Sequence, residues 1–267
     1  MTALLRARDV AVRFGGVHAL AGVDLEVQEG QLVGLIGPNG AGKTTFVDAM
    51  SGFVPYTGRI ELDGRDLAGL PPHARARAGL ARTWQSTELF DDLNIRENLA
   101  VAAHRTSGRA RRRLRWPTTT SVATIDESLD LVELGWAGEL MPGDLSQGQR
   151  KVAGVARAIA MRPRLLCLDE PAAGLDTGES DGLGRRLRGL ANSGTSMLLI
   201  DHDMGLVLST CDQVFVLEFG RVIAAGPPDV VRRDPSVITA YLGAAASEGT
   251  MDPSDDGASS LSGEVPS

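Results

Sequence analysis

The chain of 267 residues has few cysteines and no long apolar run. Its two cysteines, Cys167 and Cys211, stand among apolar residues, which favours buried thiols over a disulfide or a metal pair. No stretch of about 18 consecutive apolar residues occurs, so no membrane-spanning helix is predicted, and the early charged residues do not match a signal peptide. We therefore expect a water-soluble protein of the cytoplasm.

An excess of positive charge is also missing, because 34 acidic residues outnumber 27 basic ones and leave a net charge of −7. Such a charge balance attracts neither nucleic acid nor an anionic membrane surface, so no nucleic-acid partner is expected. Arginines gather locally between Arg105 and Arg115, in a segment with the composition of a loop. Three interpretations of this segment stay open: a solvated linker, a contact with a membrane partner, or a local contact with nucleic acid.

Short runs of valine, leucine and isoleucine alternate with amphipathic stretches, which is typical of an α/β fold whose mostly parallel sheet is covered by helices. The segments 10–14, 23–27 and 59–63 alternate apolar with polar residues and predict an N-terminal antiparallel β-subdomain. Helical spacing over about 91–142 predicts an inserted helical subdomain. Residues 1–243 are expected to form one folded domain, and the polar residues 244–267 a disordered tail.

A glycine-rich segment follows the apolar strand expected at 32–36. It consists of Gly37, Pro38, Asn39, Gly40, Ala41, Gly42, Lys43, Thr44 and Thr45. The segment matches the phosphate-loop pattern in full and leads into a predicted helix, so it makes the core a phosphate-loop NTPase. Backbone N–H groups and the helix N-terminus would surround the phosphates of ATP, Lys43 would neutralise the β- and γ-phosphate oxygens, and the Thr44 hydroxyl would ligate Mg²⁺.

The presence of a lysine in this loop is unusual for this chain, in which nearly all basic residues are arginines. Lys43 and Lys151 are the only lysines, and the other 25 basic residues are arginines. A lysine here indicates a need for a compact ammonium group, where a planar guanidinium does not fit. An incidental glycine-rich turn would require neither the lysine nor the hydroxyl beside it.

Two adjacent carboxylates end the apolar segment 165–168, further along the chain. Asp169 is a candidate ligand of Mg²⁺ and contact of the bound nucleotide, and Glu170 is a candidate general base for the attacking water. Such a pair also occurs as an ordinary helix cap. The preceding phosphate loop favours the catalytic interpretation, because both motifs serve one reaction.

The segment 145–150, Leu-Ser-Gln-Gly-Gln-Arg, lies between these motifs and resembles the signature sequence of ABC ATPases. Other family landmarks follow in order: Gln85 resembles the Q-loop glutamine, Asp176 belongs to a D-loop-like segment, and His202 resembles the switch histidine. Phe14 matches the aromatic residue that stacks on adenine. The resemblance covers about residues 4–242.

The resemblance implies an ATPase in which each ATP lies between two subunits. The phosphate loop of one subunit would face signature residues of the other, namely Ser146, Gly148 and Gln149. It also implies that Gln85 contacts Mg²⁺ and takes part in catalysis, and that His202 steadies the transferring charge. Gln147 departs from the glycine of many members, and we expect activity to be retained.

A narrower resemblance points to the ATPases of branched-chain amino acid importers, specifically the longer of their two paired subunits. It is carried by segments that include 13–17, 170–175 and 235–243. It implies a heterodimer with a second ATPase subunit, permease subunits, indirectly a substrate-binding protein, and a place at the cytoplasmic face of the cell membrane. Related amides or urea remain alternative substrates. A soluble ABC ATPase of iron–sulfur cluster assembly is the alternative function, since it would share every catalytic residue.

Overall fold

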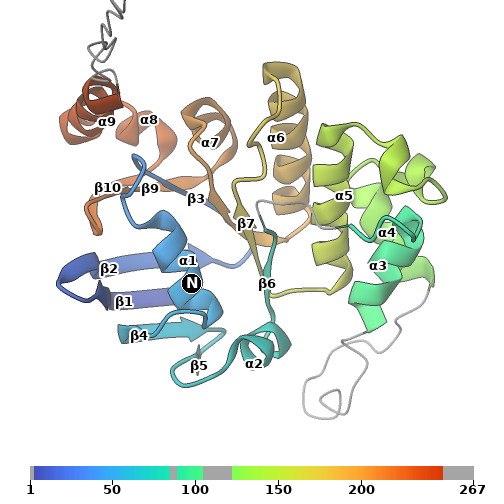
Figure 1. Ribbon diagram of the computed structural model, residues 1–267, viewed down its shortest axis with the longest axis horizontal. Coiled ribbons are helices and arrows are strands. Elements are labelled where there is room, and N and C mark those ends of the chain that lie inside the picture. Colours follow the sequence, from blue (N-terminus) through green and yellow to red (C-terminus); the bar gives the residue numbers. More distant parts are fainter. Residues whose placement is uncertain (1–2, 85–88, 105–121, 249–267) are drawn as a thin grey trace, which may run out of the picture.

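A computed structural model describes residues 3–84, 89–104 and 122–248 of the chain (Figure 1). Its strands form a smaller sheet, at the left of Figure 1, and a larger central sheet, while several helices gather at the right. Within the described ranges, no helix has the length and apolar character needed to cross a membrane. The arrangement matches the predicted α/β class.

The smaller sheet is antiparallel, with strands in the order β2, β1, β4, β5. Its strands are β1 Ala3–Phe14, β2 Val17–Gln28, β4 Thr57–Leu62 and β5 Arg65–Asp66. The predicted N-terminal β-subdomain is therefore confirmed. Strands β1 and β2 run well beyond the predicted segments, because several register shifts let them stay paired where the apolar alternation breaks.

The larger sheet has strands in the order β10, β9, β3, β8, β7, β6, all parallel to their neighbours except β10. They are β3 Leu32–Ile36, β6 Leu80–Arg82, β7 Leu165–Asp169, β8 Ser196–Ile200, β9 Gln213–Glu218 and β10 Arg221–Gly226. Strands β3, β7 and β8 are buried along their whole length, which explains their continuous apolar sequences. The predicted mostly parallel sheet is confirmed.

Each face of this sheet carries its own hydrophobic core. In β3, Val33 and Leu35 join the core shared with the β-subdomain and with α1 (Lys43–Ser51), which contributes Phe46. Leu32 and Ile36 join the core on the opposite face. The alternation of strand side chains thus divides one apolar strand between two cores. Helix α1, which follows β3 in the chain, packs in the core shared with the β-subdomain.

The second core is formed mainly by helices. They are α3 Ile95–His104, α4 Val122–Leu131, α5 Gln147–Ala160, α6 Thr177–Asn192 and α7 Met204–Thr210. Helices α3 and α4 pack on α5, with the short turns η3 Gly135–Ala137 and η4 Pro142–Asp144 between α4 and α5. Helices α3 and α4 lie within the range 91–142 for which a helical subdomain is predicted, and they pack on a helix that lies outside that range.

Three further helices are α2 Pro72–Arg77, α8 Pro228–Val231 and α9 Pro235–Glu248. Helix α9 continues five residues past Gly243, where the predicted folded domain ends. The rest of the predicted tail, 249–267, lies outside the described residues, as do the arginine-rich segment 105–115 and Gln85.

The buried Arg75 of α2 holds the C-terminus of α1 in place. Its guanidinium donates hydrogen bonds to the carbonyls of Ala49 and Met50 at 2.6 and 2.9 Å, and its Nε donates to the carbonyl of Leu70 at 2.8 Å. It also lies over the ring of Tyr56, 5.5 Å from the centroid. A cation at the end of a helix satisfies carbonyls that have no partner within the helix.

Replacement of Arg75 by Met is expected to destabilise the fold by about 3 kcal/mol, because buried carbonyls lose a charged donor. For a domain of this size we expect a fall in melting temperature of about 6–12 °C. The matched control is Arg77→Met, an exposed arginine of the same helix. Equal melting temperatures for the two variants would contradict the role given to Arg75.

Both cysteines are buried free thiols, as the sequence predicts. Burial raises the pKa of Cys211 to about 12 and raises the pKa of Cys167 well above its usual value. Because the thiolate is the reactive form, we expect a thiol reagent to label neither residue at pH 8 until the chain is unfolded. The exposed position of Ser236→Cys provides a control that reacts at once. Labelling of the native wild-type chain would refute this expectation.

Candidate active site

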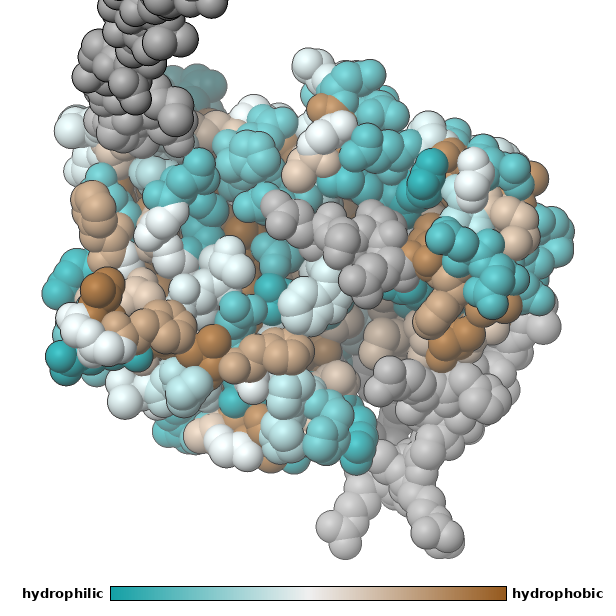
Figure 2. Space-filling model, in the orientation of Figure 1, coloured by the Kyte–Doolittle hydropathy of each residue, from teal (hydrophilic) through white to brown (hydrophobic). Residues whose placement is uncertain are grey.

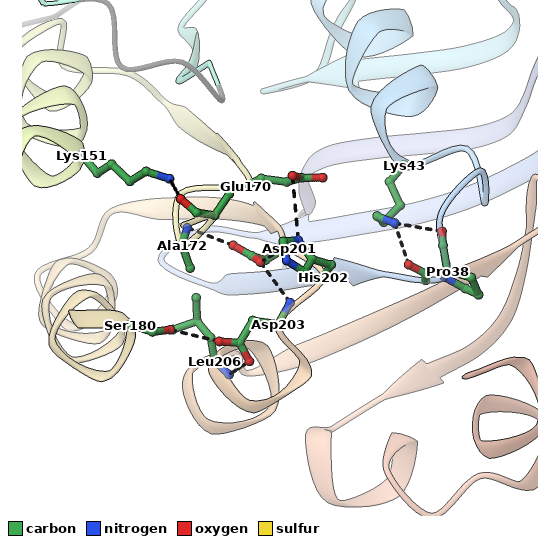
Figure 3. Close-up of polar contacts among 12 residues, drawn as sticks. Pro38, Lys43, Lys151, Glu170, Ala172, Ser180, Asp201, His202, Asp203 and Leu206 are labelled. Atoms are coloured by element: carbon green, nitrogen blue, oxygen red, sulfur yellow. Dashed lines mark hydrogen bonds and ion pairs between the residues drawn. The ribbon is translucent and has the colours of Figure 1, made fainter. Parts of the chain in front are cut away.

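The phosphate loop, the two acids and the switch-like histidine lie at the carboxyl ends of three neighbouring parallel strands. The phosphate loop follows β3, Asp169 ends β7 and Glu170 follows it, and His202 comes two residues after β8. Strand β8 lies between β3 and β7, so the topology brings these distant segments to one edge of the sheet. Figure 3 shows Glu170, Asp201 and His202 between Lys43 on one side and Lys151 on the other.

The shape of the phosphate loop depends on two glycines. Gly37 has φ 151°, and a Cβ there would lie 2.1 Å from the carbonyl oxygen of Leu217. Gly42 has φ 106°, and its Cβ would lie 2.6 Å from the carbonyl oxygen of Ala19. Larger residues are therefore excluded at both positions, since they would meet backbone.

Lys43 begins α1 and points back into the loop. Its Nζ donates hydrogen bonds to the carbonyls of Gly37 at 2.6 Å and Pro38 at 3.0 Å (Figure 3). Burial lowers the pKa of Lys43, and the nearby carboxylates Glu170 and Asp201 partly offset this effect. Gly42 caps α1 without a side-chain hydrogen bond, which leaves the helix N-terminus suited to an anion.

Glu170 is held in an unusual backbone conformation, with φ 48°. Its N–H donates to the carbonyl of Ile200 at 2.7 Å, which ties the end of β7 to the end of β8. The Nδ1 of His202 lies 3.8 Å from Glu170 Oε2 and 3.6 Å from Asp201 Oδ1. A left-handed backbone costs energy in a residue with a side chain, so the surrounding bonds must impose this placement.

Asp201 organises this turn, although the sequence motifs predict no role for it. Its side chain is fully buried, Oδ2 accepts from the N–H of Ala172 at 3.1 Å, and Oδ1 accepts from the N–H of Asp203 at 3.0 Å. It thereby fixes the turn after Glu170 against the turn around His202. The available signal was an acid at the end of a fully apolar strand, directly before the histidine.

Asp169 is buried and paired with Arg82, for which the sequence motifs also predict no role. Arg82, at the end of β6, donates from one terminal nitrogen to Asp169 Oδ2 and from the other to Asp48 Oδ1, both at 2.6 Å. Burial alone would lower the pKa of Arg82, but the hydrogen bonds to Asp48 and Asp169 raise it. The N–H of Asp169 donates to the hydroxyl of Thr83 at 3.3 Å.

The signature-like residues form the start of α5. The Ser146 hydroxyl accepts from the N–H of Gln149 at 3.2 Å, and Gln149 Oε1 accepts from the N–H of Ser146 at 2.8 Å, which is a capping box. Gly148 is buried, and a Cβ there would lie 2.7 Å from Glu179 Oε1. Figure 1 shows α5 and α1 on opposite sides of β6 and β7, so the fold does not bring these residues to the phosphate loop of the same chain.

Two more predicted positions remain. Phe14 ends β1 with 53% of its surface exposed, so its ring is available to a nucleobase. Gln85 lies in the segment 85–88, outside the described residues. The site thus combines a phosphate cradle, a lysine, a carboxylate beside a histidine, and a buried acid at the next strand end, and this set can perform attack of water on a bound phosphate.

Residues 20–173 match the sequence model of the ABC transporter family, and residues 221–247 match that of the branched-chain amino acid ATP-binding cassette transporter. The chain belongs to the ABC transporter family. The predicted ATP-hydrolysing subunit of a membrane transporter is thereby confirmed at the level of the family.

Curated relatives agree over nearly the whole length of this ABC ATPase. It is 41% identical over 254 residues to the high-affinity branched-chain amino acid transport ATP-binding protein BraF of Pseudomonas aeruginosa, and 38% identical to LivG of Escherichia coli. Each alignment covers 91% of this chain and 98% of the relative. Both relatives are transport proteins, and neither is a soluble iron–sulfur assembly ATPase.

Solved structures show the same architecture. The ADP conformation of MJ1267, an ATP-binding cassette of an ABC transporter, has a TM-score of 0.79 and 27% identity, and covers 91% of this chain and all of that one. The cbiO1 structure from Clostridium perfringens has a TM-score of 0.77 and 24% identity, over 91% of this chain and 95% of that one, and shows the shared fold. The predicted fold class is confirmed.

Proposed function

We propose that this ABC ATPase binds ATP through residues 37–45 and hydrolyses it with Glu170 as the general base. The phosphate loop and the N-terminus of α1 would hold the phosphates, with Lys43 turning from the carbonyls of Gly37 and Pro38 to the β- and γ-phosphate oxygens. His202 would donate a hydrogen bond to the γ-phosphate as charge develops. The observation that supports the proposal is that these groups lie together at the carboxyl ends of β3, β8 and β7.

The donor groups near the loop fit Mg²⁺ bound together with ATP. No group of three His, Cys, Asp or Glu side chains suited to a metal occurs within the described ranges. Mg²⁺ characteristically uses phosphate oxygens, waters and one or two protein oxygens, so a full protein cage is not required. Thr44 and Asp169 would hold the ion, with Gln85 as a third ligand. When bound, Mg²⁺ would neutralise charge on the β- and γ-phosphates.

The ATP site is completed by a second chain in this proposal. The support is that Ser146, Gly148 and Gln149 begin a helix on the far side of β6 and β7 from the phosphate loop (Figure 1). The Ser146 hydroxyl accepts one hydrogen bond from Gln149 and can still donate its proton to a γ-phosphate of the other subunit. The second chain would be a different ATPase subunit, and the pair thus a heterodimer, as the resemblance to importer ATPases with two paired subunits implies.

Permease subunits would bind near the segment 85–88. The exposed aromatic residues Trp84 and Phe90 flank it in the sequence. The exposed Phe53 packs edge-on against Trp84, with 5.3 Å between the ring centroids. Leu89 instead packs partly against the helical core, so Phe90 is the more accessible of the two neighbours. On the face drawn in Figure 2, hydrophobic side chains reach the surface over the β-subdomain and over the helices at the right.

The transporter is proposed to import branched-chain amino acids or related amides, with the chain at the cytoplasmic face of the membrane and a substrate-binding protein supplying the permeases. Support comes from the names of the relatives and from the family match at 221–247. The amino acid itself would not contact this chain, since the permeases would lie between them.

Affinity purification of the tagged chain from native membranes in detergent tests this proposal, with mass spectrometry of the proteins that accompany it. We expect two permeases and a second ATPase subunit. Binding of radiolabelled leucine and of urea to the substrate-binding protein that serves these permeases then separates the substrate classes. Recovery of a soluble assembly partner without permeases would overturn the transport role.

A further inference from the structure

Arg82 joins three parts of the ATPase that are far apart in the sequence. One end of its guanidinium bonds Asp48 of α1, the helix that begins at the phosphate loop. The other end bonds Asp169, the predicted Mg²⁺ ligand, at the end of β7. The Cζ atom of the group lies 4.2 Å from the centroid of the Trp84 ring, two residues further along the chain.

The geometry requires an arginine. Only 7% of the Arg82 side chain is exposed, and two carboxylates approach it from different elements at equal distance. A guanidinium offers several N–H donors in one rigid plane, so it can hold two acids in a fixed relative position. A lysine would keep the charge but would bring one mobile ammonium group to the same space.

We propose that Arg82 is a positioning residue that sets the orientation of the Asp169 carboxylate for Mg²⁺–ATP. Because Arg82 also contacts Trp84, a change in the position of the carboxylate changes the surroundings of that ring. This inference rests on the proposed function, because it assigns to Asp169 the binding of Mg²⁺. Arg82 occupies Asp169 Oδ2, which leaves Oδ1 as the oxygen for the ion. Groups that hydrogen-bond a metal ligand orient that ligand, and their loss commonly weakens metal binding or activity by about 10- to 100-fold.

The exposed ring of Trp84 lies against the Arg82 guanidinium, so its surroundings depend on the position of Arg82. Its ring covers the guanidinium on one side and contacts Phe53, while about half of the residue is exposed. A change in the position of Arg82 therefore changes the surroundings of an accessible indole. Trp84 also directly precedes the segment that contains Gln85.

The test is the Mg²⁺ dependence of ATP hydrolysis by Arg82→Lys, measured on the full chain assembled with its partner ATPase subunit. We expect the Mg²⁺ concentration that half-saturates ATP hydrolysis to rise by about ten-fold or more. Binding of ATP measured in EDTA should change less than about two-fold, because the phosphate loop is untouched. Arg75→Lys is the matched control, since Arg75 is another largely buried arginine that contacts α1, and it should leave the Mg²⁺ dependence unchanged.

A spectroscopic measurement supplies a second readout. Trp116→Phe and Trp136→Phe leave Trp84 as the only tryptophan, and Mg²⁺ is titrated in the presence of a non-hydrolysable ATP analogue. We expect the emission of Trp84 to change on titration, and the change to be lost or shifted to about ten-fold higher Mg²⁺ in Arg82→Lys.

A third variant covers the case in which Arg82→Lys does not fold. Asp48→Asn keeps the bond between Arg82 and Asp169 but loosens the other anchor, so the half-saturating Mg²⁺ concentration should rise by a smaller factor. A wild-type Mg²⁺ dependence and a wild-type Trp84 response in the folded Arg82 variant, or in Asp48→Asn, would overturn the inference. A wild-type complex of this chain with its partner subunit that shows no Mg²⁺-dependent ATP turnover would instead overturn the proposed function.

Discussion

Glu170→Gln is expected to lower ATP hydrolysis by about 10²- to 10⁴-fold while ATP binding is retained. The amide cannot accept the proton of the attacking water, but it has the size and hydrogen-bonding shape of the acid. The backbone of Glu170 is fixed by its bond to Ile200 and by the Asp201-centred turn, so the substitution leaves the phosphate loop in place. Steady-state phosphate release and equilibrium binding of a fluorescent ATP analogue measure the two quantities separately.

The matched control is Glu127→Gln, the same chemical change at an exposed residue of α4 that pairs with Arg162. It should turn over ATP at the wild-type rate, since an exposed ion pair contributes little and lies outside the site. We also expect Glu170→Gln to accumulate as an ATP-bound dimer with its partner subunit, visible by size-exclusion chromatography. Equal turnover by Glu170→Gln and wild type would remove Glu170 from the role of base.

Lys43→Met should abolish measurable ATP binding at concentrations that saturate the wild type, with affinity reduced by about 100-fold or more. The ammonium group is the one side-chain cation that the loop holds at its phosphate end, in reach of Gly37 and Pro38. Methionine preserves much of the length and apolar surface of the side chain, so the variant is expected to fold. Isothermal titration with ATP and Mg²⁺ gives the affinity.

The second lysine of the chain supplies the control for this variant. Lys151 is also buried and its pKa is also lowered by burial, but its ammonium group donates to the carbonyl of Ala173. Lys151→Met therefore loses an equivalent charge and should bind ATP within about three-fold of the wild type. If both lysine variants lost binding equally, a general charge effect rather than the phosphate loop would be responsible.

The fold was predictable where side-chain patterns match a single structural cause. Strands β3, β7 and β8 are apolar throughout because both of their faces are buried, and the first strands alternate because one face of the β-subdomain is less buried. The full length of β1 and β2 was not predictable. Their register shifts depend on pairing between strands, which no local pattern records.

The site was predictable as motifs but not as a network. A phosphate loop or a signature segment is continuous in the sequence, whereas the bonds from Arg82 to Asp48 and Asp169 span 34 and 87 residues. The same reason hid Asp201, whose importance comes from the bond to Ala172, 29 residues earlier in the chain. The positive φ of Glu170 is likewise a product of tertiary contacts, since glutamate has no preference for that conformation.

The position of β6 beside β7 has an evolutionary consequence. The chain leaves the sheet after Arg82 and returns at Leu165 in the neighbouring strand, so the described residues between these points form an excursion from one edge of the sheet. Such an excursion can lengthen, shorten or be exchanged between homologues without rethreading the strands that carry the ATP site. Because Ser146, Gly148 and Gln149 also lie in this excursion, selection on partner recognition and selection on the signature residues act on the same stretch of the gene.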